Sequence, residues 1–337
     1  MNLITVFPMH DHPILSIIVV SYNTRDVTLD CLRSVFTETR ETEFELIVVD
    51  NASSDGSAEA IRAEFPQIRL MTLQDNLGFA AANNLAVKEA SGNYLLLLNP
   101  DTLLQNSSID RLMAFARQQP QARIWGGRTL FGDGSLNPTS CWREMSLWSQ
   151  FCWATGLLRM APNSPIFNPA AYGGWKRDSV RQVDIITGCF LLIARQDWET
   201  LGGFDKAFFM YGEEADLCRR ARRDLGARPM ITPQAEIIHY GGLSDTVRAA
   251  KMERLIRAKI TFAEKHWSPL RSWLCRQIFR LLVLVRLTAY SLQAWLKQSD
   301  SARSNADTWL QIWQTRKTWL QGYSDGHDDG STKTPSP

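Results

Sequence analysis

Carboxylates that directly follow apolar segments are the residues of this chain best suited to chemistry. The stretch "YLLLLNPDTLL" (94–104) is apolar until it reaches Asn99, Pro100 and Asp101. Pro100 restrains Asn99 to an extended backbone, so we expect Asp101 to point beyond the end of a strand. A divalent cation prefers oxygen ligands, and one that also binds a diphosphate needs only one or two of them from protein. Asp101 is therefore a candidate metal ligand, with ordinary Asn-Pro-Asp turn chemistry as the alternative.

A second carboxylate, Asp50, ends the apolar segment 45–51. The sequence "DNASSDGS" then places Ser53 and Asp55 before a predicted helix. Carboxylates accept hydrogen bonds from a ribose and a base, and the amides at a helix N-terminus favour phosphate. We therefore predict that these three residues bind a nucleotide donor. Helix N-capping would explain Asp55 equally well, but it does not explain Asp50.

Three amide side chains and a glycine complete the predicted donor-binding set. Asn23 and Asn99 each follow a predicted strand, and Asn76 and Gly78 lie in the loop "QDNLGFAAANN" (74–84). Glycine permits close approach of a ligand to the backbone. Small residues at a helix start pack more often than they bind, so this loop supports a binding site only together with the other residues.

A cluster of acidic residues opens a predicted helix in "FFMYGEEADLCRRAR" (208–222), where Glu213, Glu214 and Asp216 fall within four positions. The helix macrodipole alone would favour negative charge there. Neighbouring carboxylates also raise the pKa of at least one member, as a general base requires, so all three are candidate catalytic residues. His239 ends a later apolar segment and could complete the metal site or contact a diphosphate, although a lone histidine there is more often structural.

The elements that must position these residues alternate between short apolar runs and helical segments up to about residue 125. The predicted strands are 15–23, 45–51, 68–73 and 93–99. Continuous apolar runs are typical of strands covered on both faces, and the alternation predicts βαβ units. We therefore predict an α/β fold with a mostly parallel central sheet and helices on both faces. Ligands of such sheets bind beyond the carboxyl ends of the strands, so we expect the polar strand ends to share one crevice.

Regularity is lost between residues 126 and 182, which we interpret as an elaborated connection rich in Gly, Pro and aromatic residues. It returns with further predicted elements. These are a strand at 183–195, a short helix around 197–201, a helix at 213–225 and a strand around 228–239.

The chain from Arg248 onward is predicted to be helical and basic. Between Lys251 and Lys297 it carries ten Lys or Arg against two Glu. Six of the twelve Trp of the whole protein lie beyond residue 266. Arginine among leucines with flanking tryptophan suits a helix at the inner-leaflet membrane surface. The alternative is a helical hairpin that packs on protein. The polar tail 322–337 is predicted to be disordered.

Composition excludes several classes of protein. The net charge of +2 gives no reason to expect nucleic acid as a partner. The six cysteines form no CxxC pair and no regular ladder, so we expect neither a zinc cage nor a disulfide framework. The N-terminus lacks the basic start of a signal peptide, and no 18 apolar residues run uninterrupted. We expect a cytoplasmic protein, peripheral on the inner face of the cytoplasmic membrane.

Taken together, these segments resemble bacterial glycosyltransferase family 2. The resemblance rests on "SIIVVSYNTRDVTLDCLRSV", "ELIVVDNASSDGS", "NLGFAAANN", "YLLLLNPDTLL", "ITGCFLLIARQDWETLGGFDKAFFMYGEEADLCRRAR" and "IIHYGG", in this order. Within the family the chain resembles rhamnosyltransferase-type members that build O-antigen and other cell-surface polysaccharides. The resemblance implies a GT-A fold, a nucleoside-diphospho-sugar donor, Mg²⁺ or Mn²⁺ as cofactor, and an inverting reaction.

The resemblance also implies roles for individual residues. Asp50 matches the nucleotide-binding aspartate, and Asp101 matches the last residue of an Asp-x-Asp metal motif in which Asn99 replaces the first aspartate. Glu214 matches the second member of an acidic pair, the proposed base. His239 matches a position near the metal. On the acceptor side the matching residues are Thr187 and Gly188.

We therefore predict an inverting glycosyltransferase that moves a sugar, with rhamnose as one candidate, to a hydroxyl of a glycan or lipid-linked glycan. The predicted domains are a catalytic domain (1–247, donor half about 15–125 and acceptor half about 126–247), a helical region (248–321) and the tail. One alternative is a non-catalytic sugar-nucleotide-binding scaffold. Another is a nucleotide-dependent oxidoreductase, which the turn "SYNTRD" disfavours because it lacks GxGxxG.

Overall fold

The computed structural model describes residues 14–241 and 248–323, and the chain divides into two compact units. The first, called the sheet unit, comprises Met1–Trp142, Lys176–Phe204 and Leu217–Ser244. The second, called the helical unit, comprises Arg143–Trp175, Asp205–Asp216 and Asp245–Pro337. Each unit is therefore assembled from segments that are distant in sequence, and the predicted domain boundaries stay a prediction.

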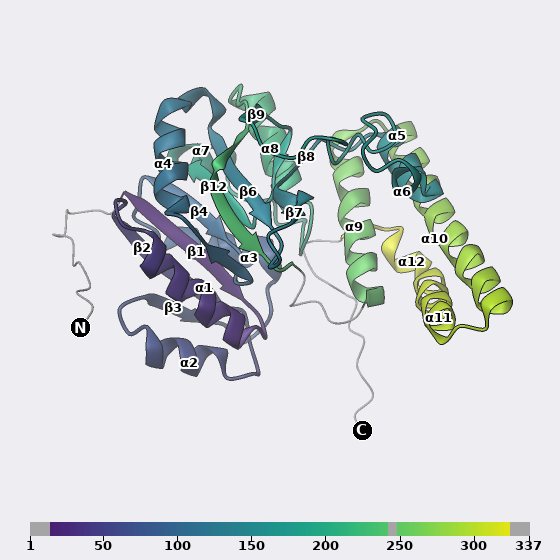
Figure 1. Ribbon diagram of the computed structural model, residues 1–337, viewed down its shortest axis with the longest axis horizontal. Helices are drawn as coiled ribbons and strands as arrows, with labels where there is room; N and C mark the ends of the chain where they lie inside the picture. Colours follow the sequence, from purple (N-terminus) through teal and green to yellow (C-terminus); the bar gives the residue numbers. More distant parts are fainter. Residues whose placement is uncertain (1–13, 242–247, 324–337) are drawn as a thin grey trace. The chain divides into compact units, whose positions relative to one another are not determined.

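The sheet unit is built on one twisted sheet whose strand order is β3-β2-β1-β4-β11-β6-β12-β5 (Figure 1). Four parallel strands form its first half, at Leu15–Ser21 (β1), Phe44–Asp50 (β2), Arg69–Thr72 (β3) and Tyr94–Leu98 (β4). All four agree with the predicted strands to within two residues at each end. The apolar run and the βαβ alternation were sufficient here, because β1, β2 and β4 are mostly buried on both faces, whereas the edge strand β3 is partly exposed.

The second half of the sheet is mixed. Its strands are Thr102–Leu104 (β5), Ile124–Leu130 (β6), Phe190–Ala194 (β11) and Met230–His239 (β12). Strand β11 runs antiparallel to both β4 and β6, whereas β12 runs parallel to β6 and antiparallel to β5. Short strands at Leu136–Asn137 (β7) and Arg181–Gln182 (β9) extend the sheet, and Cys141–Trp142 (β8) pairs with Ile185–Ile186 (β10).

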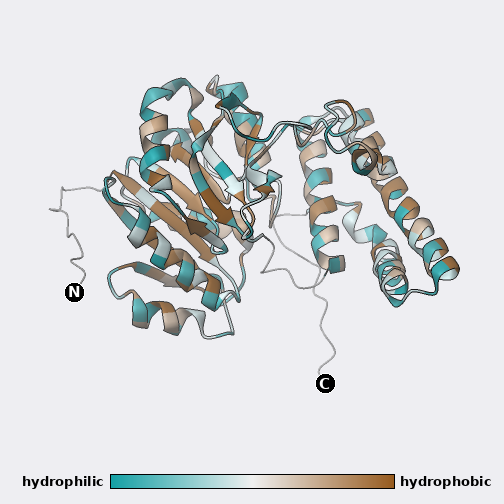
Figure 2. Cartoon of the chain, in the orientation of Figure 1, coloured by the Kyte–Doolittle hydropathy of each residue, from teal (hydrophilic) through white to brown (hydrophobic). Residues whose placement is uncertain are grey.

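Helices cover both faces of this sheet. They are Arg25–Glu38 (α1), Ser57–Glu64 (α2), Gly78–Lys88 (α3), Ser108–Gln118 (α4), Arg195–Leu201 (α7) and Glu213–Asp224 (α8), the last of which is divided between the units. Alternate β1 residues Leu15, Ile17 and Val19 share one core with α1 and α4. The intervening Ile18 and Val20 are also buried, on the face opposite that core. Figure 2 shows the resulting hydrophobic colour along the central strands.

Two sequence predictions were wrong in this half. Strand β6 lies partly in the segment predicted to be irregular, because Gly126 and Gly127 obscure its apolar pattern. Gly127 is required there, since a Cβ would lie 2.1 Å from the carbonyl oxygen of Ala235. The single strand predicted at 183–195 is instead two strands, because a turn from Thr187 to Phe190 interrupts it.

The helical unit contains Leu147–Thr155 (α5), Leu157–Met160 (α6), Arg248–His266 (α9), Pro269–Lys297 (α10), Asp300–Gln314 (α11) and Arg316–Trp319 (α12). Its core joins side chains from five of these helices, including Ala154, Ile260, Phe279, Ile312 and Trp319. The region after residue 247 is helical as predicted, and its helices pack with α5 from the irregular connection. This unit therefore has an apolar core of its own.

One face of α10 is not covered within this core. Leu270, Trp273, Trp295 and Leu296 are exposed by 67%, 53%, 75% and 64%, whereas Phe279 on the opposite face is fully buried. Among the described residues, this helix is the one that is long and apolar enough to cross a membrane by length and composition, and 17% of its most apolar window is buried. An interfacial helix meets the same description, so these features alone do not decide between the two.

Candidate functional site

The carboxyl ends of the parallel strands bring several predicted site residues to one edge of the sheet. Ser21 is paired with Asp50 at the ends of β1 and β2, and Val19 is paired with Leu98, directly before Asn99. On the other side, β5 runs antiparallel to β12 and pairs Thr102 with His239. This pairing places His239 beside Asp101, although the two are far apart in sequence.

Asp101, His239 and Asn99 form a buried cluster. The Asp101 Oδ1 atom lies 3.3 Å from His239 Nε2. The side-chain nitrogen of Asn99, Nδ2, also lies 3.3 Å from His239 Nε2. The His239 carbonyl accepts a hydrogen bond from Asn137 Nδ2 (2.9 Å), and the Thr139 hydroxyl lies 3.5 Å from His239 Nδ1. The imidazole is thus held on both sides. Asn137 and Thr139 were not predicted, because they belong to the connection in which the sequence shows no regular pattern.

The two charged groups of this cluster stabilise one another. Burial acts to raise the pKa of Asp101, but the hydrogen bond and charge of His239 outweigh it and hold that pKa below its usual value. Burial likewise acts to lower the pKa of His239, but Cys189 and Asp101 outweigh it and raise that pKa to about 10. Asp101 is therefore an anion near neutral pH, which is the form that binds a cation.

The cluster fits a divalent cation that also binds a ligand. Two atoms that coordinate Mg²⁺ or Mn²⁺ at neighbouring octahedral positions lie about 3 Å apart, close to the 3.3 Å between Asp101 Oδ1 and His239 Nε2. Within residues 14–241 and 248–323, no group of three or more His, Cys, Asp or Glu side chains is arranged to hold a metal ion. Asp101, together with His239 once it has lost its proton, would therefore hold the ion with the help of further oxygen ligands, such as those of a diphosphate.

Asp50 has one carboxylate oxygen that the described protein leaves without a partner. Its Oδ2 accepts a hydrogen bond from the Ser53 amide (3.2 Å), whereas its buried Oδ1 finds no partner among the described residues. Buried acceptors are rarely left unpaired in folded proteins unless a ligand or water uses them. This geometry suits an acceptor for a donor hydroxyl or amino group, the role predicted for Asp50.

Asn23, Ser53 and Asp55 connect the loops after β1 and β2. The Asn23 amide donates to Ser53 Oγ (2.9 Å), and the Arg25 amide donates to Asp55 Oδ2 (2.9 Å). Asp55 Oδ1 accepts from the hydroxyl and amide of Ser57. Both oxygens of Asp55 are thus used by the protein, as the capping alternative expects, and its donor-binding role stays a prediction.

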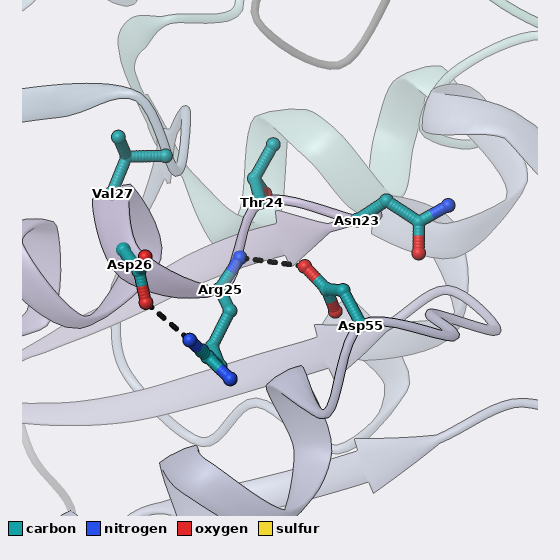
Figure 3. A pocket seen from close by; sticks show the side chains of 6 residues that line it. All are labelled: Asn23, Thr24, Arg25, Asp26, Val27 and Asp55. Carbon is teal, nitrogen blue, oxygen red and sulfur yellow. Dashed lines mark hydrogen bonds and ion pairs between the residues drawn. The ribbon is translucent and has the colours of Figure 1, made fainter.

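An open pocket of about 360 Å³ lies at these loops (Figure 3). It is lined by residues 23–27 and by Asp55, whose carboxylate accepts from the Arg25 amide in the figure. Neither Asp50 nor Asp101 lines it. The pocket therefore borders the strand ends rather than containing the candidate metal ligands.

Asn51, which directly follows Asp50, was not among the predicted binding residues, and it joins the loops after β2 and β3. Its amide nitrogen donates to Asn76 Oδ1 (2.9 Å), and its Oδ1 accepts from the Leu77 amide (2.9 Å). Asn76 Oδ1 also accepts from the Gly78 amide, which begins α3. The position of Asn51 directly after Asp50 was the available sequence signal. The structure thus brings Asn76 and Gly78 together in a turn that hydrogen bonds from the Asn51 side chain stabilise.

Thr187 and Gly188, predicted on the acceptor side, have packing roles in the sheet unit. The Thr187 hydroxyl donates to the carbonyl oxygens of Thr139 (2.7 Å) and Ser140 (3.2 Å). A Cβ on Gly188 would lie 3.0 Å from the Phe79 ring. Thr187 therefore anchors the loop that carries Thr139, and binding of an acceptor by either residue stays a prediction.

The three acidic residues of the predicted base cluster differ in their surroundings within the helical unit. Glu213 and Asp216 are buried, whereas Glu214 is only partly buried. Asp216 Oδ1 lies 2.7 Å from His266 Nε2 of α9. The Oε2 atoms of Glu213 and Glu214 find no hydrogen-bond partner within the described part of the chain. Asp216 is thus paired, while the two glutamates keep an unpaired oxygen each.

Burial dominates the electrostatics of this pair of glutamates. Burial and the neighbouring charge of Glu214 raise the pKa of Glu213 well above its ordinary value. Burial also raises the pKa of Glu214, while hydrogen bonds from backbone amides and the charge of Lys259 oppose that rise. The prediction that clustering raises a pKa here therefore agrees with the geometry. The predicted convergence of this cluster with Asp50, Asp101 and His239 stays a prediction, because it involves both units.

The chain was compared with known proteins. It is 28% identical over 241 residues to "O-antigen biosynthesis protein RfbC" of Myxococcus xanthus, with 71% of this chain and 18% of that protein covered. It is 28% identical over 238 residues to "N-acetylglucosaminyl-diphospho-decaprenol L-rhamnosyltransferase" of Mycobacterium tuberculosis, with 67% and 76% covered. The chain thus spans less than a fifth of the first of these relatives and about three quarters of the second.

A solved structure and a family model complete the comparison. "Mannosyltransferase PcManGT from Pyrobaculum calidifontis in complex with GDP-Man and Mn2+" matches with a TM-score of 0.53 and 17% identity, covering 92% of this chain and 86% of that one. At this identity the match shows the fold alone, an α/β fold of the GT-A type with helices following it. The family model for glycosyl transferase family 2 matches residues 16–184, half of the chain. This chain therefore belongs to glycosyltransferase family 2.

Proposed function

We propose that the protein is an inverting, metal-dependent glycosyltransferase that acts in the synthesis of a cell-surface glycan. The observation that carries the proposal is the buried Asp101–His239 pair at the carboxyl edge of the sheet. At the same edge, Asp50 has one carboxylate oxygen that finds no partner among the described residues. This edge is where ligands of parallel α/β sheets bind. Family membership supports transfer of a sugar as the reaction.

In this proposal the donor is a nucleoside-diphospho-sugar. Asp50 would accept a hydrogen bond from its nucleoside, and Asp101, with His239 once it is deprotonated, would hold a divalent cation. The ion would supply positive charge that stabilises the diphosphate as it leaves. Asn99, which contacts His239 Nε2, keeps the imidazole oriented toward Asp101.

Glu214 is the proposed general base. Inversion requires an acceptor hydroxyl to attack the anomeric carbon from the face opposite the leaving diphosphate, and Glu214 takes the proton of that hydroxyl. Of the three acidic candidates, Glu214 alone is partly accessible, whereas Glu213 is buried and Asp216 is buried against His266. A base must reach its substrate, so burial favours Glu214 over Glu213 and Asp216.

Rhamnose is the proposed sugar, and a lipid-linked glycan is the proposed acceptor. Two relatives support this choice by their names, one an O-antigen biosynthesis protein and the other a rhamnosyltransferase that acts on a diphospho-decaprenol acceptor. Selectivity for a sugar depends on the contacts of its hydroxyl groups in the pocket. Other nucleoside-diphospho-sugars are therefore tested alongside dTDP-rhamnose.

A thermal-shift screen of nucleoside-diphospho-sugars with and without Mn²⁺ tests the donor site, because it requires no knowledge of the acceptor. We expect one donor to raise the melting temperature only when Mn²⁺ is present, and Asp50→Asn to reduce that rise. A Ser54→Ala variant, on the same loop, serves as the control. No stabilisation by any donor would contradict the proposal.

A donor-hydrolysis assay separates the enzyme from a non-catalytic sugar-nucleotide binder. Glycosyltransferases slowly transfer sugar to water when no acceptor is present, so we expect release of nucleoside diphosphate that stops on addition of EDTA. Binding without hydrolysis, and without transfer to any lipid-linked glycan, would favour the scaffold alternative. The oxidoreductase alternative has lost its support, since the chain belongs to a sugar-transferring family.

We further propose that the protein is cytoplasmic and that the exposed face of α10 binds the inner-leaflet membrane surface. The face presents exposed Trp273 and Trp295, and Arg271 and Arg280 on the same helix are also exposed. Aromatic side chains that enter the lipid boundary, with cations that meet anionic headgroups, are typical of interfacial helices. A lipid-linked acceptor would be met at such a surface.

Vesicle flotation tests this surface. Truncation after about residue 268 would remove Phe279 and Leu282 from the core of the helical unit, so substitution of exposed residues is a better probe. We expect the Trp273→Ser, Trp295→Ser double variant to lose binding to vesicles that contain anionic lipid. Phe131→Ser removes an exposed aromatic residue from the sheet unit and should leave binding intact. Full binding by the double variant would make α10 a packing element only.

A further inference from the structure

Helix α9, from the C-terminal helical region, packs along the acidic segment that contains Glu214. A Cβ added to Gly212 would lie 3.4 Å from the Cβ of Ala258 on α9. Further along the same helix, His266 Nε2 lies 2.7 Å from Asp216. Ala258 and His266 are eight residues apart and therefore share a face of the helix. Residues 212–216 are thus held against α9 at both ends.

The residue after Ala258 is a lysine with an apolar and aromatic environment. Lys259 is partly buried, and its ammonium lies 5.6 Å from the centre of the Trp153 ring of α5. A cation over an aromatic face is held by the quadrupole of the ring. Burial lowers the pKa of Lys259, while the negative charge of Glu214, and that of Cys275 at a pH high enough to ionise it, act to raise that pKa. Lys259 lies seven residues before His266, so it shares the face of α9 that contacts Asp216 and lies on the side of the helix that faces the acidic segment.

Within the described part of the chain, charged and titratable groups near Glu214 or Lys259 come from helices that include α8, α9 and α10. Glu213 and Asp216 lie on α8 with Glu214, Lys259 and His266 lie on α9, and Cys275 lies on α10. Burial raises the pKa of Cys275 to about 12, so this thiol is neutral and does not cancel the charge of Lys259. Asp216 is engaged with His266. Lys259 is thus the cation whose charge acts on Glu214.

We propose that Lys259 is a positioning residue that keeps Glu214 ionised beside Glu213, so that helix α9 forms part of the catalytic machinery. The proposal rests on the proposed role of Glu214 as the base. A buried carboxylate next to a second carboxylate favours protonation, and a protonated base accepts no proton. An ammonium near one glutamate of the pair gives the two carboxyl groups different protonation states. It favours the negative charge on Glu214 and leaves the proton on Glu213.

Helix α9 thereby has a role in the proposed reaction in addition to its role in packing. Lys259 acts on Glu214 through its charge, so an arginine should replace it and a methionine of similar length should not. In a purely structural role, Lys259 would fill space near Trp153, and methionine would fill most of the same space. The two roles therefore predict opposite rankings of the two substitutions.

The test compares the full-length protein with its Lys259→Met and Lys259→Arg variants. The titration of Glu214 is followed by carbon-13 NMR of glutamate carboxyl groups, with Glu214→Gln used to assign the signal. We expect Lys259→Met to move the Glu214 titration to higher pH and Lys259→Arg to leave it near the wild-type position. Lys251→Met removes a cation from the same helix two turns earlier and should leave it unchanged.

The pH profile of turnover gives a second readout. With Lys259→Met, the acidic limb of kcat/KM should move to higher pH, so that the loss of activity grows as the pH falls. Thermal unfolding of each variant confirms that the fold is retained. A Glu214 titration that is unchanged in Lys259→Met would overturn the inference, whether or not activity changes.

The inference and the proposed function can fail separately. If Glu214→Gln retains full turnover, Glu214 is not the base and the catalytic role of α9 is lost, even where the titration still responds to Lys259. If Glu214→Gln abolishes turnover but the titration ignores Lys259, the proposed function stands and this inference fails.

Discussion

The acidic residues of the sheet unit and those of the helical unit have opposite electrostatic settings. In the sheet unit, His239 holds the pKa of Asp101 below its usual value despite burial. In the helical unit, burial and mutual repulsion raise the pKa of Glu213, and burial raises that of Glu214. One unit thus keeps a permanent anion, and the other prepares groups that can exchange a proton.

In the proposed function, this difference separates cation binding in one unit from proton transfer in the other. Carboxylates whose environments push their pKa values apart take separate roles in catalysis. The deciding feature is the partner, since Asp101 lies against a histidine whereas Glu213 lies against another carboxylate. Asp216 is an internal control, because it belongs to the acidic cluster and yet is paired with His266.

The largest expected effect is on turnover in Glu214→Gln. Loss of a positioned base typically costs ~10²–10⁴-fold in rate, and glutamine cannot accept the proton. We expect donor affinity to stay near that of the wild type, since Glu214 acts on the acceptor. Steady-state kinetics and donor calorimetry check both points. Glu199→Gln, an exposed residue of the sheet unit, is the matched control. Unchanged turnover would exclude Glu214 as the base, and the proposed separation of roles between the two units would then fail.

Asp216→Asn should affect stability more than chemistry. Asp216 is fully buried and lies within hydrogen-bond distance of His266, and leaving a buried polar group without its partner typically costs ~1–3 kcal/mol. Urea unfolding measures the loss, and Asp224→Asn at the exposed end of the same helix should stay within about 0.5 kcal/mol of the wild type. If Asp216→Asn instead unfolds like the wild type but loses turnover, Asp216 rather than Glu214 carries the proton.

Asp101→Asn should remove the dependence of nucleoside diphosphate binding on metal. Loss of a group that merely supports a metal ligand typically costs ~10–100-fold in affinity, and loss of a ligand itself should cost no less. Calorimetry with and without Mn²⁺ separates this effect from direct binding. Asp30→Asn, an exposed carboxylate on α1 with no predicted role in binding, provides the control. Equal effects of Mn²⁺ on Asp101→Asn and the wild type would exclude Asp101 as a ligand.

The smallest expected effect is a pH-dependent change in stability for Glu213→Gln. The pKa of Glu213 is raised in the folded state, so the folded protein binds the proton more tightly than the unfolded chain. The wild type therefore loses stability as the pH rises from the ordinary glutamate value of about 4.3 toward the folded pKa. We expect the melting temperature of Glu213→Gln to exceed that of the wild type increasingly over this range. Glu59→Gln, which is exposed, should show no such trend, and a constant difference at every pH would contradict the raised pKa.

Sequence reasoning succeeded where structure is local. The strands before Asp50 and Asn99 were predicted because their apolar runs need no distant partner to be recognised. It failed for β6, where Gly127 is required by the nearby carbonyl of Ala235 from another strand. It also treated Asp216 as equivalent to Glu213 and Glu214, because His266, the partner of Asp216, lies fifty residues away in the sequence.

The sequence by itself determined that acidic residues would follow buried strands and open a helix, because strand and helix patterns depend on near neighbours. Only the tertiary structure decided what each carboxylate faces. The antiparallel pairing of β5 with β12 sets His239 beside Asp101, and the packing of α9 sets Lys259 and His266 near the acidic helix. Charge and pKa depend on distance in space, and the fold alone fixes that distance.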